Sequence, residues 1–283
     1  MRAGLKSSLA LSLLLVLCPL RAWARPEPIP IAATQPWIAL LAAFIGGNNV
    51  AVLPLQEWNA EGSLVPSDRG RALKSLAKET NILALDTEEA QNLGLRSDAY
   101  PNLWCLDETF PVHVSNMDAV LTDPSVLPFV AQRTLTALSH WDPSSYPYYQ
   151  RRLAEFQARL FGAVLSGQQV LRGVTVYNLG GASGALLQAA GCKIETPTPE
   201  QLAEWARGRT SGLREILNAK WAEGVVTVLD SVTPKNLLHF LKGNSGVFRF
   251  EQPSVNQDYP AFLHDQYIAL WQMVSARRKA LGK

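Results

Sequence analysis

Cysteine, histidine and charged residues are all scarce in this chain of 283 residues, which has 3 cysteines, 4 histidines and 18% charged residues. The cysteines form no Cys-x-x-Cys pair, so neither a tetrahedral cysteine zinc site nor a thioredoxin-type centre is indicated. The chain also lacks Gly-x-Ser-x-Gly, His-Glu-x-x-His and a Walker phosphate loop. No motif in the sequence therefore indicates a hydrolase or a nucleotide-binding protein.

A surplus of positive charge is missing as well. The first 24 residues carry three bases and no acid, so residues 25–283 hold 23 Lys and Arg against 24 Asp and Glu. Without a basic surplus, nucleic acid is not an expected partner. No apolar run reaches the roughly 20 residues that a membrane-spanning helix needs.

The start of the chain is typical of a secretory signal peptide. Arg2 and Lys6 precede an apolar run from Leu9 to Leu20, and Ala22-Trp23-Ala24 follows as a small-x-small cleavage site. We therefore predict cleavage after residue 24 and a periplasmic or secreted mature chain. The alternative is a lipoprotein anchored through Cys18, although Leu17 stands where such signals prefer a small residue.

Two cysteines, Cys105 and Cys192, remain after this cleavage. An oxidising compartment would allow them to form a disulfide. Two separately buried thiols are the other interpretation, because sequence separation does not show whether the two Cα atoms come within about 7 Å.

Short apolar segments alternate with helical patterns along the rest of the chain, which has 47% hydrophobic residues. Strands are predicted over Ile29–Thr34, Val50–Leu55, Asn81–Leu85, Val174–Tyr177, Cys192–Glu195, Val225–Leu229 and Val247–Phe250. Helices are predicted over Pro36–Ile45, Gly184–Ala190, Pro199–Asn218, Pro234–Lys242 and Tyr259–Leu281, with a loop between the second and third strands. This alternation predicts an α/β protein with doubly wound parallel sheets.

The alternation is interrupted once, by a long amphipathic stretch. Apolar residues at Tyr149, Leu153, Phe156, Leu160 and Val164 mark one face of a helix. We therefore predict an N-terminal lobe over 25–145, a linking helix over 146–169 and a C-terminal lobe over 170–283. A ligand cleft is expected between the lobes, because parallel sheets bind ligands at the carboxyl ends of their strands.

Two further segments are given plain structural interpretations. Gly180 to Gly184 is glycine-rich and precedes a predicted helix, which suggests an anion-binding loop, but a tight turn with close helix packing is simpler. The paired acids Glu88 and Glu89 are expected to be solvated on a polar helix.

Several short motifs in a fixed order resemble one protein family. They are Leu64-Val65-Pro66-Ser67-Asp68, Leu121-Thr122-Asp123-Pro124, Pro234-Lys235-Asn236-Leu237 and Asp258-Tyr259. Together they resemble the metal-binding substrate-binding proteins of zinc and manganese ABC importers, in which one rigid helix joins two lobes. The resemblance runs from Ile31 to Val274 and implies a monomeric binding protein without catalytic activity, whose partner is a membrane permease.

The resemblance also implies a metal site of three histidines and a carboxylate, from which this sequence departs. The histidine positions fall on Ala60, Ala119 and Asn178, and Glu251 stands where the family has an aspartate. Zinc prefers four ligands of imidazole, thiolate or carboxylate type, so strong zinc binding at these positions is not expected.

Two other residues are candidate ligands. His113 would replace the second histidine if its loop is rearranged, or it is simply a solvated or structural side chain. Asp230 follows a predicted strand and either faces the cleft or caps the helix after Pro234.

Two kinds of ligand follow from these residues. Oxygen atoms of Glu251, Asp230 and Asn178 would favour a hard divalent cation such as manganese or magnesium. Alternatively, a cleft lined by Ala60, Ala119, Trp58 and Tyr177 would take a metal chelate or a small organic solute, unless these aromatic rings pack in the core. An exported hydrolase is the third, less favoured function.

Overall fold

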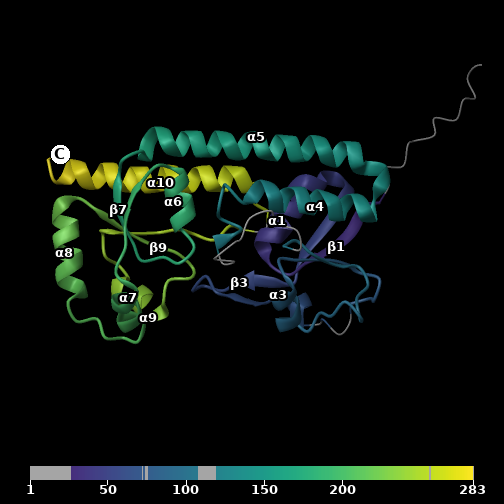
Figure 1. Ribbon diagram of the computed structural model, residues 1–283, viewed down its shortest axis with the longest axis horizontal. Coiled ribbons are helices and arrows are strands. Elements are labelled where there is room, and N and C mark those ends of the chain that lie inside the picture. The colour runs from purple at the N-terminus through teal and green to yellow at the C-terminus, as the bar shows by residue number, and fades with distance from the viewer. Residues whose placement is uncertain (1–26, 72, 74–75, 108–118, 255, 283) are drawn as a thin grey trace, which may run out of the picture.

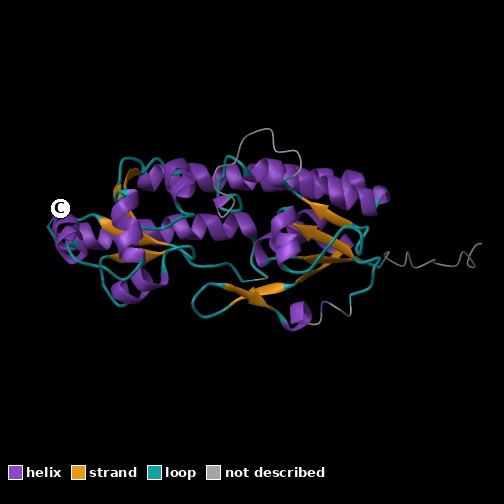
Figure 2. Ribbon diagram, turned by 60° about the horizontal axis from the view of Figure 1, so that its bottom comes forward, coloured by secondary structure: helices purple, strands orange, loops and turns teal. Residues whose placement is uncertain are grey.

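The computed structural model describes residues 27–71, 73, 76–107, 119–254 and 256–282, and it contains two parallel sheets at opposite ends of an elongated molecule (Figures 1 and 2). The first sheet has the strand order β2-β1-β5-β6. Its strands are β1 (Ile29–Ala33), β2 (Val50–Pro54), β5 (Asn81–Ala84) and β6 (Leu103–Cys105). The predicted α/β class is therefore confirmed.

The second sheet has the order β10-β9-β7-β8 and is also parallel. Its strands are β7 (Thr175–Asn178), β8 (Lys193–Glu195), β9 (Val226–Leu229) and β10 (Val247–Arg249). All four residues of β9 are buried, as expected for an inner strand covered on both faces.

Helices connect the strands of each sheet and cover its faces. In the first half they are α1 (Pro36–Gly46), α2 (Asp68–Arg71), α3 (Thr87–Asn92) and α4 (Leu127–Trp141), with 3₁₀ turns at Gly47–Asn49 and Pro143–Ser145. In the second half they are α6 (Gly184–Ala189), α7 (Pro199–Ala206), α8 (Leu213–Glu223) and α9 (Lys235–Leu241). None of the helices in the described part of the chain is long and apolar enough to cross a membrane.

One long helix runs along both lobes, and a second long helix lies beside part of it. Helix α5 (Tyr146–Leu171) has 26 residues, about 39 Å at 1.5 Å per residue, and lies along both lobes beside α10 (Tyr259–Ala280) (Figure 1). The amphipathic pattern thus located α5 correctly. The exact domain boundaries stay a prediction.

Helix α1 is apolar on all sides because it lies in the core. Ten of its 11 residues are buried. Trp37 contacts the rings of Tyr259 and Phe262 from α10, and Phe44 contacts Phe156 from α5. Continuous aromatic packing therefore ties the first lobe to both long helices.

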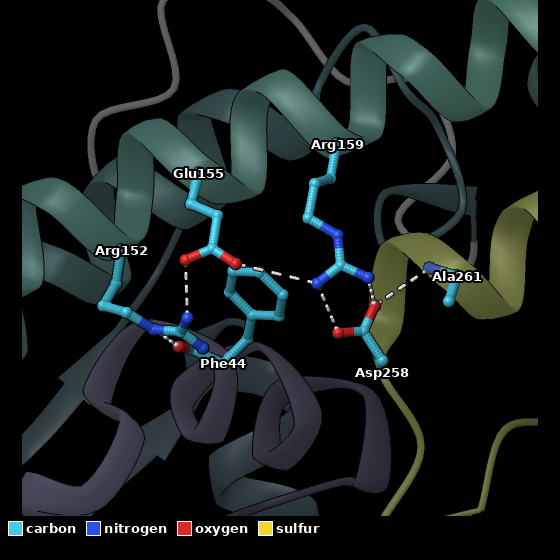
Figure 3. A network of polar contacts seen from close by, with 6 residues as sticks. All are labelled: Phe44, Arg152, Glu155, Arg159, Asp258 and Ala261. Atoms are coloured by element: carbon cyan, nitrogen blue, oxygen red, sulfur yellow. Dashed lines mark hydrogen bonds and ion pairs between the residues drawn. The ribbon is translucent and has the colours of Figure 1, made fainter.

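A polar network reinforces this junction (Figure 3). Arg159 of α5 forms an ion pair with Asp258 at 2.8 Å, and Asp258 also accepts a hydrogen bond from the Ala261 N–H at the start of α10. Arg152 donates to the Phe44 carbonyl at 2.9 Å, and both arginines lie over the Phe44 ring. One face of α5 thus holds the ends of α1 and α10 together.

The structure corrects two expectations about secondary structure. Residues predicted as a loop form an antiparallel hairpin, β3 (Gln56–Trp58) and β4 (Leu64–Pro66). The single helix predicted over Pro199–Asn218 is two helices, because Gly208 and Gly212 adopt positive φ angles of 86° and 75° that end one helix and precede the next.

The two cysteines are not bonded to each other. Cys105 lies in β6 of the first sheet and Cys192 precedes β8 of the second, and no disulfide joins them. The structure therefore agrees with the second interpretation, in which the two thiols are separate. Burial raises the pKa of the Cys192 thiol to about 11, so this thiol stays protonated at neutral pH.

Candidate functional site

A cavity of about 610 Å³ lies between the two lobes. Its lining residues follow the carboxyl ends of strands in both sheets: Gln35 follows β1, Leu85 follows β5, Asp230 follows β9 and Phe250 follows β10. Because both sheets are parallel, all of their ligand-facing loops lie at one edge, and the two edges face each other. The fold therefore places the cavity where such sheets bind ligands.

The first lobe contributes a wall of amide, carboxylate and indole groups. Gln35 and Trp37 come from the start of α1, Trp58 comes from the β3–β4 hairpin, and Glu88 and Glu89 come from α3. Trp58 is half-buried, whereas Trp37 is buried in the contact with α10. The hairpin that the sequence did not predict is thus part of this wall.

Glu89 is the central polar group of the first wall. Its carboxylate accepts hydrogen bonds of 2.7 Å from the Thr34 hydroxyl, the Gln35 amide and the Leu85 N–H. Burial raises the pKa of Glu89 above its usual value of 4.5, while these three donors oppose the shift and the nearby Asp86 adds to it. The expectation that Glu89 is solvated is therefore wrong, because its helix follows β5 and turns this residue inward.

The second lobe is organised around the carboxylate of Asp230, which is 3% exposed. It accepts five backbone N–H groups, those of Gly181, Ala182, Ser183, Val232 and Thr233, at distances of 2.8 to 3.2 Å. The glycine-rich loop therefore does bind an anion, but the anion is a side chain of the protein itself. Helix α9 receives no side-chain cap from it.

Asn178 is held in the same loop. Its side-chain oxygen accepts hydrogen bonds of 3.0 Å from the Gly180 N–H and the Ser183 hydroxyl, and its amide group donates to the Gly180 carbonyl at 3.3 Å. Asn178 is 5% exposed and does not line the cavity. Its polar atoms form hydrogen bonds within the loop whose residues Ala182 and Ser183 line the cavity.

Glu251 differs from these groups because its side chain is exposed. Its backbone N–H donates to the Gln266 side chain at 3.0 Å, which fixes the segment after β10 against α10. The carboxylate lines the cavity and has no hydrogen bond or ion pair within the described residues.

The remaining candidate residues are dispersed. Trp58 lines the cavity, and Ala60 is exposed at an adjoining hollow that also contacts Trp58 and Glu251. Tyr177 is buried in the core of the second lobe, and Ala119 is half-buried; neither is among the lining residues. His113 lies outside the described residues.

The polar groups brought together here do not fit a metal ion. Asp230 and Asn178 direct their oxygens to backbone and hydroxyl donors, which leaves Glu251 as the only one of the three with a carboxylate open to the cavity. In the part of the chain that the structure describes, no three His, Cys, Asp or Glu side chains are grouped closely enough to hold a metal. The ligand roles suggested for these residues, and for His113, stay predictions.

The residues that sequence reasoning missed are Glu89, Gln35, Gln252 and Gln266, all in the cavity wall. Only the position of these residues after predicted strands could have indicated a role at the cavity. Gln35 and Glu89, for example, follow β1 and β5, which lie side by side in the parallel sheet. No local motif marks them.

Solved structures of known proteins share this architecture of two α/β lobes and a long helix. The sequence matches no protein-family model and none of the curated proteins with which it was compared. The structure is similar to ZnuA, with a TM-score of 0.62 over 87% of this chain and 99% of that chain at 15% identity.

Two further solved structures are similar. One is the laminin-binding protein Lmb of Streptococcus agalactiae, described as having adhesin and metal-transporting activity, with a TM-score of 0.62 at 18% identity over 87% of this chain and 99% of that one. The other is the binding protein FpvC from Pseudomonas aeruginosa in complex with Mn²⁺, with a TM-score of 0.61 at 14% identity over 88% and 99%. At these identities the likeness confirms the fold that the motifs implied.

Proposed function

We propose that this protein is the exported solute-binding component of an ABC importer, which carries a solute in the cavity between its lobes to a membrane permease. The observation that carries the proposal is the cavity itself, placed between the carboxyl edges of two parallel sheets. Known proteins of this fold include a solute-binding protein and a metal-transporting protein. A cavity that binds and releases a solute requires no catalytic group.

The ligand in this proposal is larger than a single metal ion. A cavity of about 610 Å³ is in the range of sites for small organic molecules. Bare zinc or manganese is the weaker candidate, because the oxygens of Asp230 and Asn178 are already used by the protein. A metal enclosed in an organic chelate stays compatible with the cavity.

Analysis of what the purified exported chain carries tests the proposal. Protein isolated without added ligand is denatured, the released small molecules are identified by mass spectrometry, and metals are measured in the same sample. We expect about one solute per chain, which raises the melting temperature when it is added back to stripped protein. Stripped protein that responds neither to its own extract nor to any metal ion would contradict the proposal.

A further inference from the structure

The charged side chains that line the cavity in the described part of the chain are all acidic. Its described lining includes five carboxylates, those of Asp86, Glu88, Glu89, Asp230 and Glu251, and no Lys, Arg or His. A cavity with such a lining attracts cations and repels anions.

Three of these carboxylates already accept hydrogen bonds from the protein. Asp230 accepts five backbone N–H groups, Asp86 accepts the Glu89 N–H at 2.7 Å as the N-cap of α3, and Glu89 accepts from Thr34, Gln35 and Leu85. Glu88 and Glu251 are both exposed, and neither carboxylate forms a hydrogen bond or ion pair with another described residue. They belong to different lobes, so an occupant of the cavity would lie between two uncompensated negative charges.

The rest of the lining suits an organic molecule better than an ion. Trp58 presents a half-buried indole, and Phe250 and Phe262 add apolar surface from the second lobe. Aromatic faces also attract organic cations through their ring quadrupoles.

From these observations we infer that the solute is a small organic cation with an apolar or aromatic body, held between Glu88 of the first lobe and Glu251 of the second. This inference rests on the proposed function and specifies its ligand. The cation contacts one carboxylate on each wall, and the aromatic side chains pack against its body. Gln35 of the first lobe and Gln252 of the second also line the cavity.

Matched pairs of probes that differ only in charge test this inference. Tryptamine is compared with tryptophol, choline with 3,3-dimethylbutan-1-ol, and arginine with citrulline, each at millimolar concentration in a thermal-shift assay on stripped protein. Indole-3-acetate, zinc and manganese are included as the anionic and metal arms. We expect at least one cation to raise the melting temperature more than its neutral partner does, and indole-3-acetate to have no effect.

Charge-neutralising variants locate the effect. Glu88→Gln and Glu251→Gln change exposed side chains, so both variants should fold as the wild type does. Each should weaken the binding of the active cation about two- to fivefold and leave the affinity of its neutral partner unchanged. Glu215→Gln, an equally exposed acid on α8 outside the cavity, is the matched control and should bind as the wild type does.

The outcomes separate this inference from the proposed function. A neutral or anionic molecule recovered from the purified chain, or binding by zinc or manganese alone, would overturn the organic cation and leave the binding-protein role intact. Failure of every cation to exceed its neutral partner would also overturn it. Protein that carries no solute and responds to none would overturn both.

Discussion

A single buried carboxylate, that of Asp230, decides the shape of the second-lobe wall. Because it accepts five backbone N–H groups from two loops, we expect Asp230→Asn to lower the free energy of unfolding by about 3 kcal/mol, since the side-chain NH₂ that replaces one carboxylate oxygen cannot accept from these donors. Urea denaturation measures the loss. The control is Asp98→Asn, which removes an exposed ion pair with Arg96 and should cost less than about 1 kcal/mol. Equal effects of the two substitutions would contradict this role.

Glu89 should give the stability of the protein a distinct pH dependence. Its pKa is raised from 4.5 by burial, so above pH 4.5 the folded chain keeps a proton that the unfolded chain releases. Its contribution therefore favours the folded state at low pH and is lost as the pH rises through the raised pKa. Relative to Glu89→Gln, the wild type should lose stability from pH 4.5 upward in chemical denaturation. Parallel stability curves for the two proteins would be inconsistent with a buried, titrating Glu89.

The contact between the two long helices depends on a glycine. A Cβ atom at Gly167 of α5 would lie 2.7 Å from the ring of Tyr267 in α10, whereas at Gly162 of the same helix it would meet no described atom within 4 Å. We expect Gly167→Ala to destabilise the fold by about 2 kcal/mol through overpacking, and Gly162→Ala to stabilise it by about 0.5 kcal/mol through helix propensity. Thermal denaturation of both variants checks this prediction, and stabilisation by both would show that α10 adjusts freely.

The molecule as a whole is built to resist large movement of its lobes. Besides α5 and α10, direct bonds cross the junction: the Thr122 hydroxyl donates to the Ala182 carbonyl at 3.1 Å, Arg249 donates to the Glu61 carbonyl in the hairpin, and the Tyr259 hydroxyl donates to the Leu121 carbonyl. Hinge closure requires loop residues whose φ and ψ angles change freely, and a packed helix supplies few of them.

We therefore expect nearly superimposable small-angle scattering curves for stripped protein and for protein saturated with its solute. The reference for a detectable change is the Gly167→Ala variant, in which the contact between α5 and α10 is disturbed. A clear contraction of the wild type on binding would contradict the rigid junction.

Local sequence patterns were sufficient to predict the fold class, most strands and the long helix. Parallel strands buried on both faces are short, nearly continuous apolar runs, so β1, β5 and β9 are visible without knowledge of the tertiary structure. The spacing of buried side chains along α5 from Tyr149 to Leu160 likewise follows from helix geometry alone. The β3–β4 hairpin was missed because neither strand exceeds three residues and each depends on the other for its hydrogen bonds.

Which polar residues reach the cavity, and which form hydrogen bonds within the protein instead, depends on the packing of distant loops. Asp230 and Glu251 both follow strands of the second sheet and are equivalent candidates in the sequence. The first is surrounded by backbone N–H groups from a loop about 50 residues earlier in the chain, and the second has no such neighbours. The difference arises because hydrogen-bond partners distant in the sequence are set by how the loops pack, which no local pattern encodes.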